Sequence, residues 1–201
     1  MMTTATSVSI LPATEMDREP AIQVLARAFE ADPAVRWMYP DAQQYGTNFP
    51  PFVMAFAGRA FAAGTADVAD GFRGAALWLP PGVQPDEERL VELLERSVQD
   101  DRREAVFAIL EQMGRYHPAG PHWHLPLIGV DPAHQGNGLG SELLRHGLER
   151  CDRARLPAYL ESSNPRNLPL YERHGFRTIG TIQAGSSPAL YPMLRPPVMG
   201  R

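Results

Sequence analysis

The apolar positions of the chain change their period near residue 130, and this change marks its most informative stretch. Residues 125–130 form an apolar run of strand length that ends at Asp131-Pro132. Beyond a glycine-rich segment, apolar side chains recur at intervals of three to five residues: Leu139, Leu143, Leu144, Leu148 and Cys151. Such intervals place side chains on one face of a helix. The pattern therefore predicts a strand, a turn and a helix that ends near Arg153.

The beginning of the chain predicts a short strand followed by a helix. Residues 8–11 are apolar and suit a first or edge strand. Thr14, with Asp17 three positions later, resembles a helix N-cap with an acid in the first turn. One helical face follows, made of Ile22, Leu25, Ala26 and Phe29. The helix should end near Asp32-Pro33, because the residue before a proline disfavours helical angles.

A loop, a second helix and a hairpin come next. Residues 34–41 carry two large aromatic side chains between prolines, which predicts a loop. Residues 49–63 predict an apolar helix of the core or of a channel lining. Residues 65–69 and 73–79 predict two strands around Asp70-Gly71, a dipeptide typical of hairpin turns.

The remaining helical segments surround the glycine-rich stretch. Residues 86–113 are helical in pattern, and the charged run 99–104 is either a solvated face or a break between two helices. Residues 156–162 predict a strand. Residues 164–174 predict a short helix that Gly175 ends, since glycine is common just past a helix.

The order of these elements predicts one α/β (α+β) domain over residues 1–201. Two last strands are expected at residues 177–182 and 189–194. Strands and helices then alternate in a way that gives a mixed sheet flanked by helices. A chain of 201 residues is the usual length of a single domain with its own core.

The composition excludes several classes of protein. The chain is 44% hydrophobic and 21% charged, as in ordinary globular proteins, and we expect it in the cytoplasm because no signal peptide or membrane span is visible. The net charge is −4, from 19 basic and 23 acidic residues without a basic block, which argues against nucleic acid as a partner. The single cysteine, Cys151, excludes an internal disulfide and a cysteine-based zinc site.

The glycine-rich turn predicts an anion site. Gly136, Gly138 and Gly140 separate the strand from the helix. The first turn of a helix offers unpaired N–H groups and the positive end of the helix dipole. Glycines allow the backbone to approach a ligand closely, and a phosphate is the expected ligand.

Two common phosphate motifs do not fit this turn. The spacing G-x-G-x-G differs from the dinucleotide fingerprint G-x-G-x-x-G, and the chain has no lysine for a P-loop. What fits is Q/R-x-x-G-x-G/A, in residues 135–140. This segment resembles the acetyl-CoA pyrophosphate loop of the GNAT superfamily of N-acetyltransferases. The resemblance implies one GNAT-type domain with its coenzyme core at about 122–182.

The resemblance also implies how acetyl-CoA (coenzyme A after transfer) is held. A mostly antiparallel sheet of six to seven strands is expected, with the coenzyme between two splayed central strands. The pantetheine arm would pair with the backbone of Ile128 and Val130 as an added strand does. The implied contacts are Ile128, Val130, Gln135, Gly136, Asn137, Gly138, Leu139, Gly140, Ser141, Asn164, Asn167 and Tyr171.

A second GNAT-like segment indicates the general acid. Within residues 156–176 the pattern N-x-x-A-x-x-L-Y-x-x-x-G-F is matched at Asn164, Leu170, Tyr171, Gly175 and Phe176, while Asn167 replaces the usual alanine. By this resemblance Tyr171 protonates the leaving thiolate. A phenol of pKa about 10 can give a proton to a thiolate whose conjugate acid has a pKa of about 8.5.

The candidate general base is Glu161, on the strand before Asn164. We expect burial to raise its pKa so that it accepts the amine proton directly or through water. A purely structural carboxylate remains an equal alternative. His122 and His124 share one strand face, but no third ligand is apparent, so no metal is expected.

The acceptor is the least determined part of the prediction. Trp37, Tyr39 and His124 are the expected substrate contacts. The segments 74–82, 122–144 and 156–176 together resemble the puromycin N-acetyltransferase-like subgroup, which implies a small primary amine such as an antibiotic or aminonucleoside. A peptide or protein N-terminus is the alternative acceptor, and a non-catalytic acetyl-CoA sensor is the alternative class. A monomer or homodimer is expected, and Cys151 is assigned to the core rather than to an acyl-enzyme.

Overall fold

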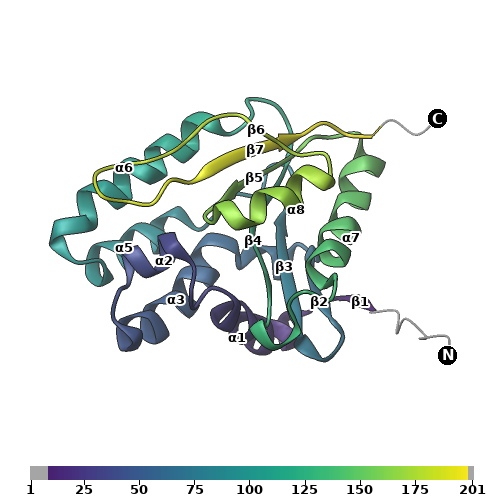
Figure 1. Cartoon of the computed structure of the whole chain (residues 1–201). Coiled ribbons are helices and arrows are strands. Elements are labelled where there is room, and N and C mark those ends of the chain that lie inside the picture. Colours follow the sequence, from purple (N-terminus) through teal and green to yellow (C-terminus); the bar gives the residue numbers. More distant parts are fainter. Residues whose placement is uncertain (1–8, 199–201) are drawn as a thin grey trace.

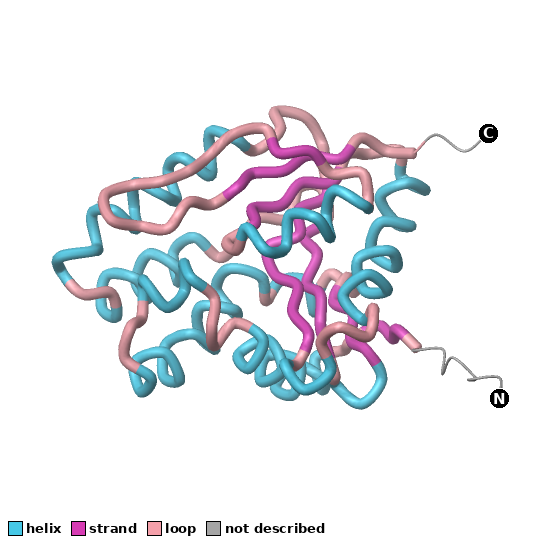
Figure 2. The backbone as a smooth tube through the Cα atoms, viewed as in Figure 1, coloured by secondary structure: helices cyan, strands magenta, loops and turns pink. Residues whose placement is uncertain are grey.

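A seven-stranded sheet forms the centre of the structure, a computed structural model that describes residues 9–198 (Figures 1 and 2). Its strand order is β1-β2-β3-β4-β5-β7-β6, and all neighbours are antiparallel except β4 and β5. The strands are β1 (Ile10–Pro12), β2 (Ala66–Ala69), β3 (Gly74–Leu79), β4 (Trp123–Val130), β5 (Ala158–Ser162), β6 (Arg177–Thr178) and β7 (Tyr191–Arg195). The predicted mixed, mostly antiparallel sheet is confirmed.

Helices cover both faces of this sheet. They are α1 (Arg18–Ala28), α2 (Pro33–Met38), α3 (Ala42–Ala57), α4 (Arg59–Ala62), α5 (Glu87–Ser97), α6 (Asp100–Tyr116), α7 (Leu139–Ala154) and α8 (Leu168–Arg173), with short 3-10 turns η1 (Glu15–Asp17), η2 (Asp70–Phe72), η3 (Pro132–His134) and η4 (Pro165–Asn167). The predicted N-cap is present, because Thr14 and Asp17 form a reciprocal capping box. Among the described residues, no helix is long and apolar enough to cross a membrane.

The loop predicted for residues 34–41 is wrong, since most of it is helix α2. The Asp32 carboxylate accepts hydrogen bonds from the backbone N–H groups of Ala34 (3.0 Å) and Val35 (3.1 Å). Pro33 occupies the first turn, where its missing N–H is not needed. The proline that indicated a loop therefore begins a helix.

Other boundaries also differ from the prediction. The charged run 99–104 follows a break, with Val98 extended between α5 and α6. The strand expected at 177–182 is shorter: β6 ends at Thr178, and Ile182 forms only an isolated bridge to Leu190. Residue 8 of the first predicted strand lies outside the described residues.

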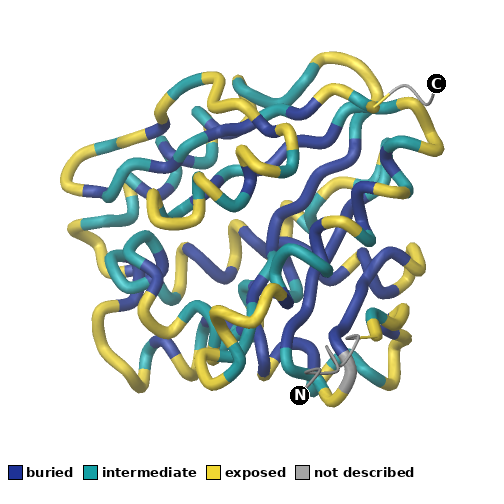
Figure 3. The backbone as a smooth tube through the Cα atoms, turned by 45° about the vertical axis from the view of Figure 1, so that its right-hand side comes forward, coloured by how far each residue is buried: buried dark blue, intermediate teal, exposed yellow. Residues whose placement is uncertain are grey.

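Two cores lie on opposite faces of the sheet, whose strands are mostly buried (Figure 3). Side chains of β3 alternate between them, with Leu77 in the core under α1 and α3 and Trp78 in the core under α7. On β4, however, Leu125 and Leu127 belong to opposite cores although they are two residues apart. A β-bulge explains this, because Leu77 pairs with Leu127 whereas Leu79 pairs with His124.

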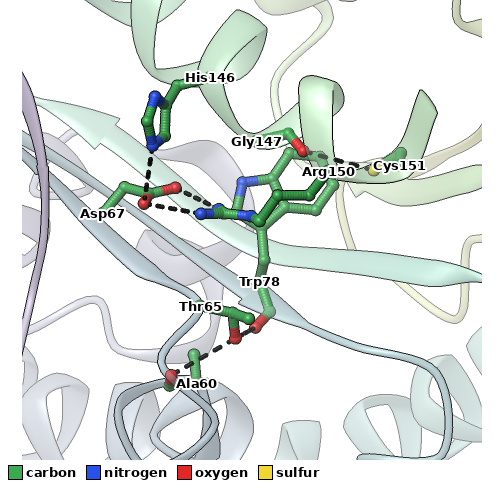
Figure 4. A network of polar contacts seen from close by, with 8 residues as sticks. All are labelled: Ala60, Thr65, Asp67, Trp78, His146, Gly147, Arg150 and Cys151. Atoms are coloured by element: carbon green, nitrogen blue, oxygen red, sulfur yellow. Dashed lines mark hydrogen bonds and ion pairs between the residues drawn. The ribbon is translucent and has the colours of Figure 1, made fainter. Parts of the chain in front are cut away.

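A buried ion pair joins α7 to β2 (Figure 4). The Asp67 carboxylate is fully buried and accepts two hydrogen bonds from the Arg150 guanidinium, one of them 3.0 Å long. His146 lies 3.5 Å from the same carboxylate. Charged groups out of water require such partners, so α7 is fixed in one position over the sheet.

The sheet opens between β4 and β5. These strands run parallel, and Trp123 pairs with Ala158 and His124 with Tyr159, with no further pair among the described residues. Pro126 follows within β4, at the bulge, where the strand has no N–H to donate. The two strands therefore diverge toward their C-terminal ends and leave room for ligands, as the prediction of splayed central strands requires.

Candidate active site

A cavity of about 660 Å³, partly open to solvent, lies at the start of α7. The turn before the helix depends on glycine: Gly136 and Gly138 have φ of +79° and +80°, a region that favours residues without a Cβ. Gly138 is the N-cap and provides no side-chain acceptor for the first-turn N–H groups. Those groups are therefore free to bind an anion in this cavity, which we call the coenzyme cavity.

Unpaired backbone groups of β4 face the same gap. The N–H of Asp131 donates to the carbonyl of Arg73 at 2.9 Å. Because pairs alternate along an antiparallel ladder, Gly129 is turned toward β3 while Ile128 and Val130 turn their N–H and C=O groups away from it. The Val130 carbonyl accepts a bond from the Gln135 amide at 3.1 Å, which agrees with this direction. An extended ligand could pair with Ile128 and Val130 here.

Most of the predicted coenzyme contacts line this cavity. The exception is Asn137, which does not line the cavity. Its side-chain amide donates to the His134 carbonyl at 3.3 Å. Arg166 and Arg173, which the sequence reasoning did not single out, also line it and supply positive charge suited to phosphates. The only feature of the sequence that indicated a role for these two arginines was their position close to the motif residues Asn164 and Tyr171.

A second cavity, of about 130 Å³ and partly open, adjoins the first one. Its walls come from α2, α3, α6, β4 and β5, and it includes Trp37 but not Tyr39. We call it the acceptor cavity. The two cavities share four lining residues: Phe29, Ile128, Asn167 and Tyr171.

Tyr171 is therefore at the junction of the two cavities. It lies on α8 and is 6% exposed. Burial raises its pKa, and the negative charge of Asp32 adds to the effect. The phenol consequently keeps its proton at neutral pH and can act as a proton donor.

Glu161 occupies an environment that the sequence did not predict. Its side chain is 3% exposed, and its carboxylate lies 3.0 Å from His124 Nε2 and 3.4 Å from His117 Nε2. Burial by itself raises the pKa of Glu161, but the charge of His124 and polar contacts with both imidazoles lower the pKa to about 2. The expected upward shift is therefore wrong, because the interactions with the two imidazoles outweigh the loss of water.

The histidines continue away from Glu161 toward a third cavity. His117 Nδ1 lies 3.3 Å from His122 Nε2, and His122 Nδ1 lies 2.8 Å from the Gly120 carbonyl. His117, His122 and His124 all line this cavity, which we call the histidine cavity, whereas Glu161 lines the acceptor cavity. A chain of ionisable groups thus joins the two cavities.

The same cluster contains three potential metal ligands, and they differ from the pair His122 and His124 that the sequence suggested. Ligand atoms of His117, His124 and Glu161 all lie within 4.8 Å of one another. Two imidazoles and a carboxylate are a donor set that zinc accepts. His124 Nε2 bonds one oxygen of Glu161, whereas the other oxygen, Oε1, is buried and has no hydrogen-bond partner among the described residues. His117 was missed because it caps the end of α6, outside the strand pattern that drew attention to His122 and His124.

Of the predicted substrate contacts, Tyr39 and His124 do not line the acceptor cavity. Tyr39 is fully buried, and its hydroxyl lies 2.8 Å from Ser97 Oγ, so it belongs to the packing of α2 on α5. Cys151 is also fully buried, and burial raises the pKa of its thiol to about 12. A thiol with that pKa is a poor nucleophile at neutral pH.

Comparison with known proteins places these features in context. Residues 75–176 match the sequence pattern of the Acetyltransferase (GNAT) family. A crystal structure of histone acetyltransferase HPA2 and related acetyltransferase from Corynebacterium glutamicum is similar, with a TM-score of 0.72 and 29% identity over 97% of this chain and 99% of that one.

Sequence relatives are similar over shorter segments. The N-alpha-acetyltransferase RimI of Mycobacterium tuberculosis is 34% identical over 74 residues, 37% of this chain and 46% of that protein. An uncharacterised N-acetyltransferase of Schizosaccharomyces pombe is 43% identical over 54 residues, 27% of this chain and 22% of that protein. The matched segments thus span less than half the length of either relative.

Proposed function

The chain belongs to the Acetyltransferase (GNAT) family and is an acetyltransferase, and from this premise we propose that it moves an acetyl group from acetyl-CoA directly to the primary amine of a small molecule. The observation that carries this proposal is the meeting of the coenzyme and acceptor cavities at Tyr171. Two cavities that share one wall can hold a donor and an acceptor in contact, which removes much of the entropic barrier to transfer.

The coenzyme cavity fits acetyl-CoA, which would supply the acyl thioester. Its glycine turn offers helix N–H groups to the pyrophosphate, and Arg166 and Arg173 add positive charge. The outward-facing backbone of Ile128 and Val130 suits the amide groups of a pantetheine arm. The Val130 N–H is also a candidate donor to the thioester oxygen as negative charge develops there.

Tyr171 serves as the general acid in this proposal. Its raised pKa keeps the phenol protonated, and its position at the junction gives it access to the sulfur of a bound thioester. A thiolate that leaves with a proton from Tyr171 does not need to be stabilised as an anion. The phenol is then reprotonated from water.

The general base is the Glu161–His124 pair rather than Glu161 alone. An ammonium has no lone pair, so the amine must lose a proton before or during attack. A carboxyl group whose pKa is about 2 is a weak base, whereas an imidazole is suited to proton transfer near neutral pH. We propose that Glu161 takes the proton from the acceptor, directly or through water, and that His124 and His117 carry it to the histidine cavity.

An acceptor cavity with helices on three sides favours a small molecule over the N-terminus of a peptide or protein, our alternative acceptor. An extended chain needs an open groove, whereas this cavity is bounded by α2, α3 and α6. The presence of both an acid and a base candidate favours catalysis over acetyl-CoA sensing. The resemblance to the puromycin N-acetyltransferase-like subgroup remains part of the proposal and is compatible with a small amine.

The test is a steady-state kinetic study with acetyl-CoA and a reactive amine, in which thiol release is followed. Direct transfer predicts intersecting double-reciprocal lines, because both substrates bind before reaction. The Cys151→Ser variant should show the same pattern and a turnover within about threefold of the unaltered protein, since this buried thiol is not used. Parallel lines, or loss of turnover in this variant, would instead indicate an acyl-enzyme.

A further inference from the structure

We infer that the acceptor is a primary amine whose remaining part is apolar and carries no second charge. This inference rests on the proposed function and names the class of its substrate. It comes from the walls of the acceptor cavity, which include residues of α2, α3 and α6. These helices pack in the other core of the sheet from α7; Figure 1 shows their arrangement.

The acceptor cavity has almost no charge of its own. Among the described residues that line it, the ionisable side chains are Glu161 and Tyr171, and neither arginine nor histidine is present. Both of these groups have roles in the proposed proton transfers. The wall formed by α5 and α6 consists of apolar side chains: Leu94, Val106, Ile109, Leu110 and Met113.

A second charge on the acceptor would have no partner in this cavity. The carboxylate of a free amino acid would leave water without meeting a cation, and the distal ammonium of a diamine would meet the apolar wall of α5 and α6. Burial of an unpaired charge is strongly unfavourable, so such molecules should bind poorly. An amino acid joined through its carboxyl group as an amide or ester loses that charge and stays within the predicted class.

Aromatic side chains on the opposite walls favour a flat apolar body. The Trp37 indole N–H donates to Ser186 Oγ at 3.2 Å, so its polar atom is satisfied and its ring is held in place. Phe52 and Phe56 stack with their ring centroids 5.3 Å apart. These rings offer large apolar surfaces to a ligand at low entropic cost.

Matched pairs of amines test the inference with the unaltered protein. Phenylethylamine is compared with phenylalanine and with phenylalanine amide, and hexylamine with hexamethylenediamine, at one pH and a saturating acetyl-CoA concentration. We expect kcat/KM for phenylethylamine to exceed that for phenylalanine by at least about 100-fold, with most of the difference recovered by the amide. The kcat/KM for hexylamine should likewise exceed that for hexamethylenediamine.

A designed change of specificity provides a second measurement. Leu110 is half-buried in the cavity wall, and Leu110→Glu would place a carboxylate where a distal ammonium lies. The kcat/KM ratio of hexamethylenediamine to hexylamine should rise at least about 10-fold in Leu110→Glu and remain unchanged in Leu110→Gln, which has the same shape without charge.

The outcomes separate this inference from the function on which it rests. If phenylalanine or hexamethylenediamine reacts as well as its singly charged partner, the inference is wrong while the acetyltransferase proposal stands. If no amine releases thiol, the proposed function itself is contradicted. If Leu110→Glu does not fold, the matched amines still decide the question with the unaltered protein.

Discussion

At the scale of single residues, Glu161 shows that burial alone does not determine the pKa of a carboxyl group. Its side chain is nearly inaccessible to water, yet two imidazoles hold it ionised. The pKa of this carboxyl group is therefore set by the cluster and not by its own burial alone.

The lowered pKa of Glu161 predicts a dependence of stability on pH. The pKa rises from about 2 in the folded protein to its ordinary value of 4.5 on unfolding, so the stabilisation is complete above that ordinary value and is lost as pH falls toward 2. The difference in free energy of unfolding between the unaltered protein and Glu161→Gln should shrink over this range, by up to about 1.4 kcal/mol per pH unit for one proton.

Urea unfolding between about pH 5 and pH 3 measures this effect. The exposed Glu92→Gln on α5 is the control, and its difference from the unaltered protein should change little over the same range. A Glu161→Gln difference that is constant with pH would show that the carboxylate is not held by charged partners.

Sequence motifs located single residues only where the site is local in the chain. Tyr171 and Asn164 lie in one short segment, and the glycine turn in another, so the resemblance of these segments to GNAT motifs was enough to propose them. His117 and Asp32 reach the site only through tertiary packing, and no periodicity or motif marks them. The direction of the pKa shift of Glu161 could not be predicted because it depends on His117.

At the scale of elements, α7 approaches the sheet closely at Gly147. A Cβ at this position would lie 2.1 Å from Trp78 Nε1, and Trp78 is fully buried (Figure 4). Neither the helix nor the indole can move freely, because the Asp67–Arg150 ion pair fixes α7 nearby. We expect Gly147→Ala to reduce the free energy of unfolding by about 1–3 kcal/mol through overpacking.

Gly114→Ala on α6 is the matched control for this prediction. A Cβ there meets no heavy atom within 4 Å, so the change should stabilise the protein by about 0.4–1 kcal/mol. Chemical denaturation of both variants measures the two effects. Equal stability of the variants would mean that α7 does not pack on Trp78 as described.

The glycine turn before α7 gives a prediction for coenzyme binding. Gly138 and Gly64 both have positive φ, and a Cβ at either would meet no neighbour within 4 Å. Valine at each position should therefore introduce similar backbone strain, about 1–3 kcal/mol. Only Gly138→Val should also weaken coenzyme A binding, by about 10-fold or more, because its side chain occupies the anion site.

Isothermal titration calorimetry of coenzyme A measures this difference directly. An affinity for Gly138→Val equal to that of Gly64→Val would rule out the pyrophosphate role of the turn.

Element types followed from sequence more readily than element boundaries. The periodic helices were predicted because their side chains alternate between water and core, and the hairpin was predicted from the Asp70-Gly71 dipeptide between two apolar runs. Helix α2 was missed because Pro33 and the following aromatic residues suggest a loop, while the capping by Asp32 is a short-range feature that overrides them. Strand β6 was predicted too long because apolar composition does not reveal where pairing stops.

At the scale of the whole molecule, the separation of β4 from β5 leaves room for the two proposed reactants. The coenzyme cavity lies at the start of α7, the acceptor cavity lies among α2, α3 and α6, and Tyr171 joins them. The histidine cavity is the proposed exit for the proton. The coenzyme contacts were predicted from local motifs. The acceptor cavity is assembled from segments far apart in sequence, and of the predicted substrate contacts only Trp37 lines it.

The central claim is that Tyr171 acts in transfer and not in holding the coenzyme. The most direct test compares Tyr171→Phe with the unaltered protein by acetyl-CoA-dependent thiol release and by the Kd of coenzyme A, with Tyr191→Phe on β7 as the control. We expect kcat to fall by about 10²- to 10⁴-fold in Tyr171→Phe while Kd changes less than about threefold, and both to be unchanged in Tyr191→Phe. An unchanged kcat, or a Kd that weakens as much as kcat falls, would contradict the account.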